Sequence, residues 1–216
     1  MSAPDGTALD RTRYDAVAFD LLTALIDSWT LWNRAAGTEA EGMRWRRAYL
    51  RLTYGCGAYR AYEDLVREAA VEAGLGPDAP ERLTATWDDL APWPEASGIL
   101  ARLAARGVPL GVATNCSVAL GTRAAARLGV RFASLVTAEA AGFYKPRPEP
   151  YRAMLAGLGT DPARTLFVAG SPADIPGASG VGMPVFWHNR AGLPPVDDAA
   201  RPLLVADTLE PLRALA

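Results

Sequence analysis

Short runs of β-branched and aromatic residues alternate along this chain with helical patterns, and this alternation restricts the fold more than any other feature. The first run, YDAVAFD, ends at Asp20. Strands that alternate with helices join into a parallel sheet covered on both faces. We therefore predict an α/β fold with a doubly wound, Rossmann-like sheet. The predicted strands are 14–20, 108–114, 133–137, 165–170, 183–187 and, more weakly, 203–206, and the helices between them are 95–106, 118–128 and 149–158, which end before Gly107, Gly129 and Gly159.

The stretch from about residue 27 to residue 93 breaks this alternation. It carries long amphipathic patterns such as MRWRRAYLRL and no convincing strand, and it ends in segments rich in proline and glycine. Because it leaves the core after the first predicted strand and returns before the second, we expect a small helical cap over the ends of those strands. The predicted division is a core of residues 1–26 and 94–216 and a cap of residues 27–93.

Charge and composition exclude several classes of function. With 22 basic and 24 acidic residues the net charge is −2, so the chain lacks the basic surface that nucleic acids require. No apolar stretch is long enough to span a membrane, and the first residues lack the layout of a signal peptide, so we expect a cytoplasmic protein without membrane partners. Two cysteines are too few for a disulfide scaffold, and a single histidine, His188, excludes a histidine-rich metal site.

Polar side chains follow four of the predicted strands. In doubly wound sheets ligands bind beyond the carboxyl ends of the strands, so we expect these side chains to share one pocket. Lys145 is the only lysine in a chain that otherwise uses arginine, and it would hold Asp20 ionised, as a nucleophile requires. Each residue alone also fits ordinary capping or turn chemistry, but their order is more specific. The candidates are Asp20, Thr114, Asn115, Lys145, Ser171 and Asp174.

Four segments together resemble the motifs of the haloacid dehalogenase superfamily, over essentially the whole chain. FDLLTALID resembles the first motif, with Asp20 as the nucleophile, and VATNCS resembles the second, with Thr114 and Asn115. YKPRPEPY resembles the third, with Lys145, and VAGSPADIPGA resembles the fourth, with Asp174. The resemblance implies a Rossmann-like core, and the helical insertion matches the family's cap.

The chain departs from the magnesium-dependent phosphatases of this superfamily. Those enzymes have an aspartate general acid two residues after the nucleophile, where this chain has Leu22, and leucine transfers no proton. The expected threonine is Ala24, and the first acidic residue of the fourth motif is Gly170. Of the usual magnesium ligands only Asp20 and Asp174 remain, so a magnesium site would be weak.

The 2-haloacid dehalogenase branch fits better, because displacing a halide from carbon requires neither a metal nor a proton donor. Tyr151, six residues after Lys145, matches that branch's spacing, and the FWHNRAG segment resembles one of its motifs. Trp45-Arg46 resembles its Trp-Arg pair, which implies that Arg46 meets the substrate; otherwise Arg46 belongs to a solvated helix face with its neighbouring arginines.

The match to that branch is incomplete. Its threonine and serine positions are Ala24 and Ala169, and its asparagine is Ser171. Losing such polar groups can slow catalysis, although Thr23 offers a hydroxyl one position early. Leu22, in place of an aromatic residue, changes the pocket wall. Six aromatic residues of the insertion are expected mainly in the cap core, and Cys116 is expected to be a packed thiol; the six are Trp29, Trp32, Trp45, Tyr49, Tyr54 and Tyr59.

We therefore expect a hydrolase that acts without a cofactor on a small carboxylate-bearing molecule through an aspartyl ester. Asp20 attacks carbon, Lys145 keeps it charged, and Asp174 anchors Lys145 or orients water. Thr114 and Asn115 contact substrate oxygens, while Arg46, Tyr151, Leu22 and Ser171 form the substrate site. Two alternatives remain, a Mg²⁺-dependent phosphatase and a binding protein without catalysis. The resemblance also allows a homodimer, and the substrate and its chirality stay open.

Overall fold

The computed structural model describes residues 9–196 and 200–216. Its centre is a six-stranded sheet in the order β3-β2-β1-β4-β5-β6, and every neighbouring pair of strands is parallel. This arrangement confirms the predicted doubly wound α/β fold. The strands are β1 (Ala16–Phe19), β2 (Leu110–Thr114), β3 (Ser134–Thr137), β4 (Thr165–Ala169), β5 (Val185–His188) and β6 (Leu204–Ala206).

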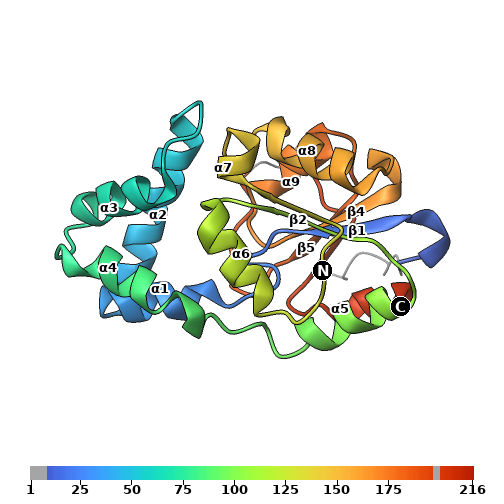
Figure 1. Ribbon diagram of the computed structural model, residues 1–216, viewed down its shortest axis with the longest axis horizontal. Helices are drawn as coiled ribbons and strands as arrows, with labels where there is room; N and C mark the ends of the chain where they lie inside the picture. The colour runs from blue at the N-terminus through green and yellow to red at the C-terminus, as the bar shows by residue number, and fades with distance from the viewer. Residues whose placement is uncertain (1–8, 197–199) are drawn as a thin grey trace.

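Helices cover both faces of the sheet, which explains why the central strands read as unbroken apolar runs. Side chains along β1 alternate, so that Val17 and Phe19 pack in one buried cluster while Ala18 packs in the other. Figure 1 shows α8 and α9 over one face and α5 and α6 over the other. The core helices are α5 (Ala96–Ala105), α6 (Val118–Ala126), α7 (Ala138–Ala141), α8 (Pro148–Leu158) and α9 (Asp174–Gly180), with short 3-10 turns at Arg11–Arg13, Pro162–Arg164 and Glu210–Leu215.

Four helices lie to one side of the sheet, between β1 and β2 in the chain (Figure 1). We call residues 27–93 the helical insertion. The segments that enter and leave it run side by side, because Ile26 pairs with Pro92 and the Asp27 amide donates to the Ala91 carbonyl at 2.9 Å. Its helices are α1 (Ser28–Ala36), α2 (Glu39–Gly55), α3 (Tyr62–Glu72) and α4 (Asp78–Ala85), followed by a 3-10 turn at Trp87–Asp89.

The reversal of strand order occurs at β1, which lies between β2 and β4. The chain therefore leaves β2 and β4 in opposite directions, and a crevice opens beyond the carboxyl end of β1, where Asp20 stands. Among the described residues, no helix combines the length and the apolar character that a membrane crossing requires. The expectation of no signal peptide concerns a segment whose residues 1–8 lie outside those described.

Candidate active site

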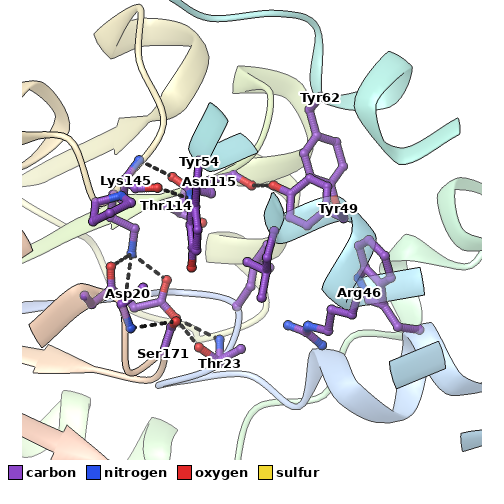
Figure 2. A pocket seen from close by; sticks show the side chains of 16 residues that line it. Asp20, Thr23, Arg46, Tyr49, Tyr54, Tyr62, Thr114, Asn115, Lys145 and Ser171 are labelled. Carbon is purple, nitrogen blue, oxygen red and sulfur yellow. Dashed lines mark hydrogen bonds and ion pairs between the residues drawn. The ribbon is translucent and has the colours of Figure 1, made fainter. Parts of the chain in front are cut away.

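The residues predicted from the strand ends meet at one cavity of about 60 Å³. Asp20, Thr114, Asn115, Lys145, Ser171 and Asp174 all line it, together with Leu22 and Arg46. Figure 2 shows Lys145 and Asp20 on one side of this cavity and Arg46 on the other. Asp20 and Leu22 follow β1, Asn115 follows β2 and Ser171 follows β4, whereas Arg46 comes from α2 of the helical insertion. We call this space the inner cavity.

Asp20 is held by donors on both of its carboxylate oxygens. Oδ1 accepts a hydrogen bond from Lys145 Nζ at 2.8 Å. Oδ2 accepts from the Thr23 amide at 3.0 Å, the Thr23 hydroxyl at 2.5 Å and the Ala24 amide at 3.2 Å. Thr23 therefore supplies the hydroxyl that Ala24 lacks, as expected. Burial by itself raises the pKa of Asp20, but attraction to Lys145 and these hydrogen bonds outweigh burial and lower the pKa below its ordinary value.

Lys145 joins two buried carboxylates. Its ammonium lies 2.8 Å from Asp20 Oδ1 and 3.0 Å from Asp174 Oδ1, and its side chain is only 3% exposed. Burial alone lowers the pKa of Lys145, but the charges of Asp174 and Asp20 more than reverse this and raise it. The only lysine of the chain is thus a buried cation fixed beside Asp20 and not a surface charge.

Asp174 begins α9 and lies behind Lys145. Burial raises the pKa of Asp174, and the attraction of Lys145 reverses that effect only in part because Asp20 repels a second negative charge nearby. Tyr151 Oη donates to Asp174 Oδ1 at 2.7 Å, and its ring packs edge-on against Phe167. Tyr151 is fully buried and lines neither cavity at this site, so the expectation that it holds a substrate is corrected: its hydroxyl orients Asp174.

Asn115 links two of the loops through its side-chain amide. Its nitrogen donates to the Lys145 carbonyl at 2.9 Å, and its Oδ1 accepts from the Lys145 amide at 2.7 Å (Figure 2). This reciprocal pair fixes the backbone of Lys145 relative to the end of β2. From the sequence we expected only a substrate contact from Asn115, because a clamp between residues 30 positions apart leaves no mark in sequence spacing.

Gly170 has no room for any side chain. A Cβ placed there would lie 2.3 Å from the Ala24 amide nitrogen and 2.3 Å from Thr23 Oγ1. The loop after β1 therefore occupies the volume that the acidic residue of a magnesium phosphatase would need. The two remaining carboxylates, Asp20 and Asp174, already accept hydrogen bonds from the ammonium between them, and a divalent cation would repel that charge. These residues do not fit a magnesium site, and no group of three or more histidine, cysteine or acidic side chains within residues 9–196 and 200–216 is arranged to hold a metal.

Arg46 brings a second buried cation to the cavity. Its guanidinium lies 3.9 Å from the Trp29 ring centroid, and Nη2 donates to Ser28 Oγ at 2.7 Å. Ser28 Oγ in turn donates to the Leu22 carbonyl. Nη1 is buried and has no hydrogen-bond partner among the described residues. At 8% exposure Arg46 does not belong to a solvated helix face, and burial lowers its pKa to about 10.

Aromatic side chains of the insertion form much of the cavity wall. Trp32, Tyr49 and Tyr54 line the inner cavity together with Tyr62. Trp32 and Tyr49 are also buried in the hydrophobic core, so the expected cap core is at the same time a wall of the cavity. Trp45 packs in this core and is fully buried. Their orientation toward the sheet follows from tertiary packing of α2 and α3, which periodicity alone does not define.

The buried thiol and the single histidine stay outside the chemistry. Cys116 is fully buried, and burial raises the pKa of its thiol to about 12, so it remains a protonated, packed side chain. His188 does not line the inner cavity; its Nδ1 lies 2.8 Å from the Ala24 carbonyl, and its ring packs edge-on against Trp93. Burial lowers the pKa of His188, so its imidazole is a neutral part of the core.

Comparisons with known proteins agree with this geometry. The family model for haloacid dehalogenase-like hydrolases matches residues 5–182. The (S)-2-haloacid dehalogenase of Pseudomonas sp. strain YL is 30% identical over 82% of this chain and 83% of its own. A phosphoglycolate phosphatase of Rhodospirillum rubrum is 32% identical over 68% of this chain and 59% of its own. The crystal structure of an L-2-haloacid dehalogenase, 26% identical, superposes with a TM-score of 0.84 and covers 94% of this chain and 98% of that one.

The family model matches most of the chain, and the fold is shared with a solved dehalogenase structure. These two findings assign the chain to a family. The chain belongs to the haloacid dehalogenase-like hydrolase family, and its similarities match the 2-haloacid dehalogenase (type II) branch of that family.

Proposed function

We propose that this hydrolase displaces a halide from C2 of a small 2-haloacid without a metal, by an ester formed on Asp20. The observation that carries the proposal is a buried carboxylate held ionised by Lys145, facing a buried guanidinium with an unpartnered nitrogen across the same cavity. The names of relatives support the substrate class, since several are haloacid or haloacetate dehalogenases. We also propose that residues 27–93 act as the cap, because they supply Arg46 and the aromatic walls.

The first step forms a bond between an Asp20 oxygen and C2 of the substrate while the carbon–halogen bond breaks. The halide leaves with the bonding electron pair, so the leaving group needs no proton. This removes the need for a general acid at the position of Leu22, which lines the cavity instead. Lys145 and Thr23 keep Asp20 ionised before attack, and the Arg46 guanidinium meets the negative charge of the substrate carboxylate or the departing halide.

The second step hydrolyses the ester. Water adds to the Asp20 carboxyl carbon, and the bond from that carbon to the ester oxygen breaks. This oxygen, which came from Asp20, leaves as the hydroxyl of the 2-hydroxy acid, the oxygen of the water stays in the Asp20 carboxylate, and one proton is released. Asp174, whose pKa is raised by burial, accepts the proton from the attacking water, and Tyr151 holds the Asp174 carboxylate in place. Thr114 and Ser171 line the space where the water enters. No cofactor takes part, since displacement and hydrolysis both run on the side chains described.

Halide release tests the proposal directly. With EDTA present, the native protein is expected to release halide from 2-chloro and 2-bromo acids, and Asp20→Asn is expected to lose at least about three orders of magnitude in kcat. Asp15→Asn, an exposed carboxylate at the start of the same strand, serves as the control and retains activity. Activity toward phosphate esters that requires Mg²⁺, with silence toward haloacids, would favour a phosphatase instead.

A single turnover in ¹⁸O-labelled water identifies the intermediate. An ester on Asp20 places the first labelled oxygen in the Asp20 carboxylate and leaves the product unlabelled, because water attacks the protein carbon. Direct displacement by water would put the label in the hydroxy acid at the first turnover. Mass analysis of the peptide that contains Asp20, beside that of the product, separates the two routes.

A further inference from the structure

A second and larger cavity adjoins the inner cavity. It measures about 320 Å³, against about 60 Å³ for the inner one. Its size reaches the range of small-molecule binding sites, whereas the inner cavity has room only for a few atoms. We call it the outer cavity. Six residues line both spaces, and Figure 2 labels four of them; the six are Thr23, Arg46, Leu50, Tyr54, Ser171 and Ala173.

The walls of the outer cavity are mainly apolar and come from distant parts of the chain. Those that line only this cavity include Trp29 and Met43 of the insertion and Leu193, Pro194 and Val196 of the core. Arg47 also lines it and is exposed to solvent. A substituent that entered from the inner cavity would therefore pass from polar groups to hydrocarbon.

Exposed apolar side chains gather at the same place. Five large hydrophobic side chains are exposed within the described ranges, and two of them, Tyr54 at 42% and Val196 at 60%, line the outer cavity. The other three, Val71, Val118 and Val205, line neither of the two cavities. Apolar surface that is gathered beside a buried cation is typical of a ligand site rather than of scattered surface residues.

Arg46 stands at the junction and determines what kind of ligand fits. Its buried, unpartnered Nη1 requires an anionic or accepting group near the inner cavity. On the other side, Trp29 stacks on the guanidinium and continues into the apolar wall. An anionic head with an apolar tail satisfies both ends, whereas a two-carbon acid would leave the outer cavity without an occupant.

We propose that the outer cavity binds the C2 substituent of the substrate, and that this substituent is an unbranched alkyl chain or an aryl group. This inference rests on the proposed function, because it places C2 beside Asp20 and the carboxylate or halide near Arg46. The substrate class is then a 2-haloalkanoic acid of medium chain length or an aryl-substituted 2-haloacid. The C2 substituent of the substrate extends past Tyr54 and Leu50 toward Met43 and Val196.

A chain-length series tests the inference. From 2-bromopropanoate to 2-bromohexanoate and 2-bromooctanoate, kcat/KM is expected to rise about threefold to fourfold for each methylene that enters the cavity. Met43→Trp and Val196→Trp fill the cavity with a larger ring. Each is expected to lower the ratio of kcat/KM for the octanoate to that for the propanoate by at least about tenfold. Val71→Trp, at an exposed valine that lines neither cavity, is the matched control and keeps the native ratio.

Binding of the product analogues separates this inference from the proposed function. One outcome is that no bromo acid is turned over, but 2-hydroxyoctanoate raises the melting temperature of the native protein more than 2-hydroxypropanoate does, and this difference is absent in Met43→Trp. The outer cavity, which we call the tail site, then binds the C2 substituent, and the dehalogenase proposal fails. If bromo acids are turned over with a flat chain-length profile, or the tryptophan variants keep the native ratio, the tail site is wrong and the dehalogenase proposal stands. If Val196→Trp changes the mass in light scattering while selectivity is unchanged, the cavity is a contact between two copies, which also overturns the inference.

Discussion

Thr23 and Gly170 share one small volume beside Asp20. The Thr23 hydroxyl reaches Asp20 Oδ2 at 2.5 Å, and a Cβ on Gly170 would lie 2.3 Å from that hydroxyl oxygen. Because residue 170 is glycine, the Thr23 hydroxyl has room to lie beside Asp20. The chain departs from the family pattern at Ala24 and at Gly170, and each departure alone looks like the loss of a polar group. Together they form one local rearrangement, in which the Thr23 hydroxyl still donates to Asp20.

Removing the Thr23 hydroxyl is expected to slow the chemical step. Thr23→Val leaves Asp20 Oδ2 with two backbone donors, so we expect kcat to fall about tenfold to a hundredfold with little change in KM. Because this hydrogen bond lowers the pKa of Asp20, the acid limb of the kcat profile moves to higher pH in the variant. Thr23→Ser retains the hydroxyl and is expected to recover most of the activity. An unchanged kcat and pH profile in Thr23→Val would show that Thr23 does not position Asp20.

Replacing Lys145 gives a stability change that depends on pH. In the native protein the pKa of Asp20 is lowered, so its contribution to stability is present above the unfolded pKa of about 3.9 and is lost as pH falls through the folded value. In Lys145→Met the two buried carboxylates repel each other and the ammonium no longer opposes the effect of burial, which raises their pKa values. We expect the variant to be less stable by about 3 to 5 kcal/mol near pH 7 and the difference to shrink as pH falls toward about 5.

Urea unfolding at several pH values measures this difference, and Arg147→Met is the control. Arg147 is an exposed cation two residues away that pairs with Glu149. Its removal is expected to change stability by less than about 1 kcal/mol, with no narrowing toward acid pH. A Lys145→Met deficit that stays constant from neutral to acid pH would mean that the two carboxylates do not depend on this ammonium.

The sheet was predictable because four of its strands, β1, β2, β4 and β5, are buried on both faces. All six predicted strands form, and the weakest prediction, 203–206, corresponds to β6 at the edge, where burial is partial. Helix α7 was not predicted, since AEAA is too short to show a period. The convergence of Asp20, Asn115, Lys145 and Asp174 followed from strand topology alone. Other features of the site depend on side-chain packing between loops, which sequence spacing does not encode. They are the hydrogen bonds of Asn115 to Lys145, the lack of room at Gly170 and the unpartnered Nη1 of Arg46.

Helices α1 and α2 approach closely at one glycine. A Cβ on Gly42 would lie 2.2 Å from Asn33 Oδ1 and 2.7 Å from the Asn33 Cα. Gly42→Ala must therefore push the two helices apart, and we expect a loss of about 1 to 3 kcal/mol in unfolding free energy. Because α1 carries Trp29 and α2 carries Arg46, kcat/KM should fall as well.

Gly55→Ala, in the same helix, is the control for this prediction. Nothing lies within 4 Å of a Cβ at Gly55, so alanine there is expected to be neutral or stabilising by up to about 1 kcal/mol. Urea midpoints and kcat/KM of both variants give the comparison. Equal stability of the two alanine variants would contradict the close packing of α1 on α2.

Some of the hydrogen bonds that join the insertion to the core lie around the inner cavity. Tyr49 Oη donates to the Asn115 carbonyl at 2.8 Å, and the Tyr59 amide donates to the Gly142 carbonyl at 2.7 Å. Ser117 Oγ donates to Glu63 at 2.7 Å. These contacts close the site over Lys145, and others join the two parts elsewhere, such as the Trp87 indole, which donates to the Leu120 carbonyl at 2.9 Å. The core, in contrast, is held together by a continuous sheet of six paired strands. The molecule is therefore expected to open between the two parts at a lower free energy than it unfolds.

Acetylation of Lys145 measures that opening, because the chain of 216 residues has no other lysine. At 3% exposure and with a raised pKa, the amine is neither accessible nor neutral in the closed protein. We expect labelling of the peptide that contains Lys145 to begin at urea concentrations below the unfolding transition. The labelling rate should depend less steeply on urea concentration than global unfolding does, because opening exposes less surface. Tyr49→Phe, which removes one of the joining hydrogen bonds, should accelerate labelling more than it lowers the unfolding midpoint. Labelling that follows the global transition in both proteins would mean that insertion and core open as a single unit.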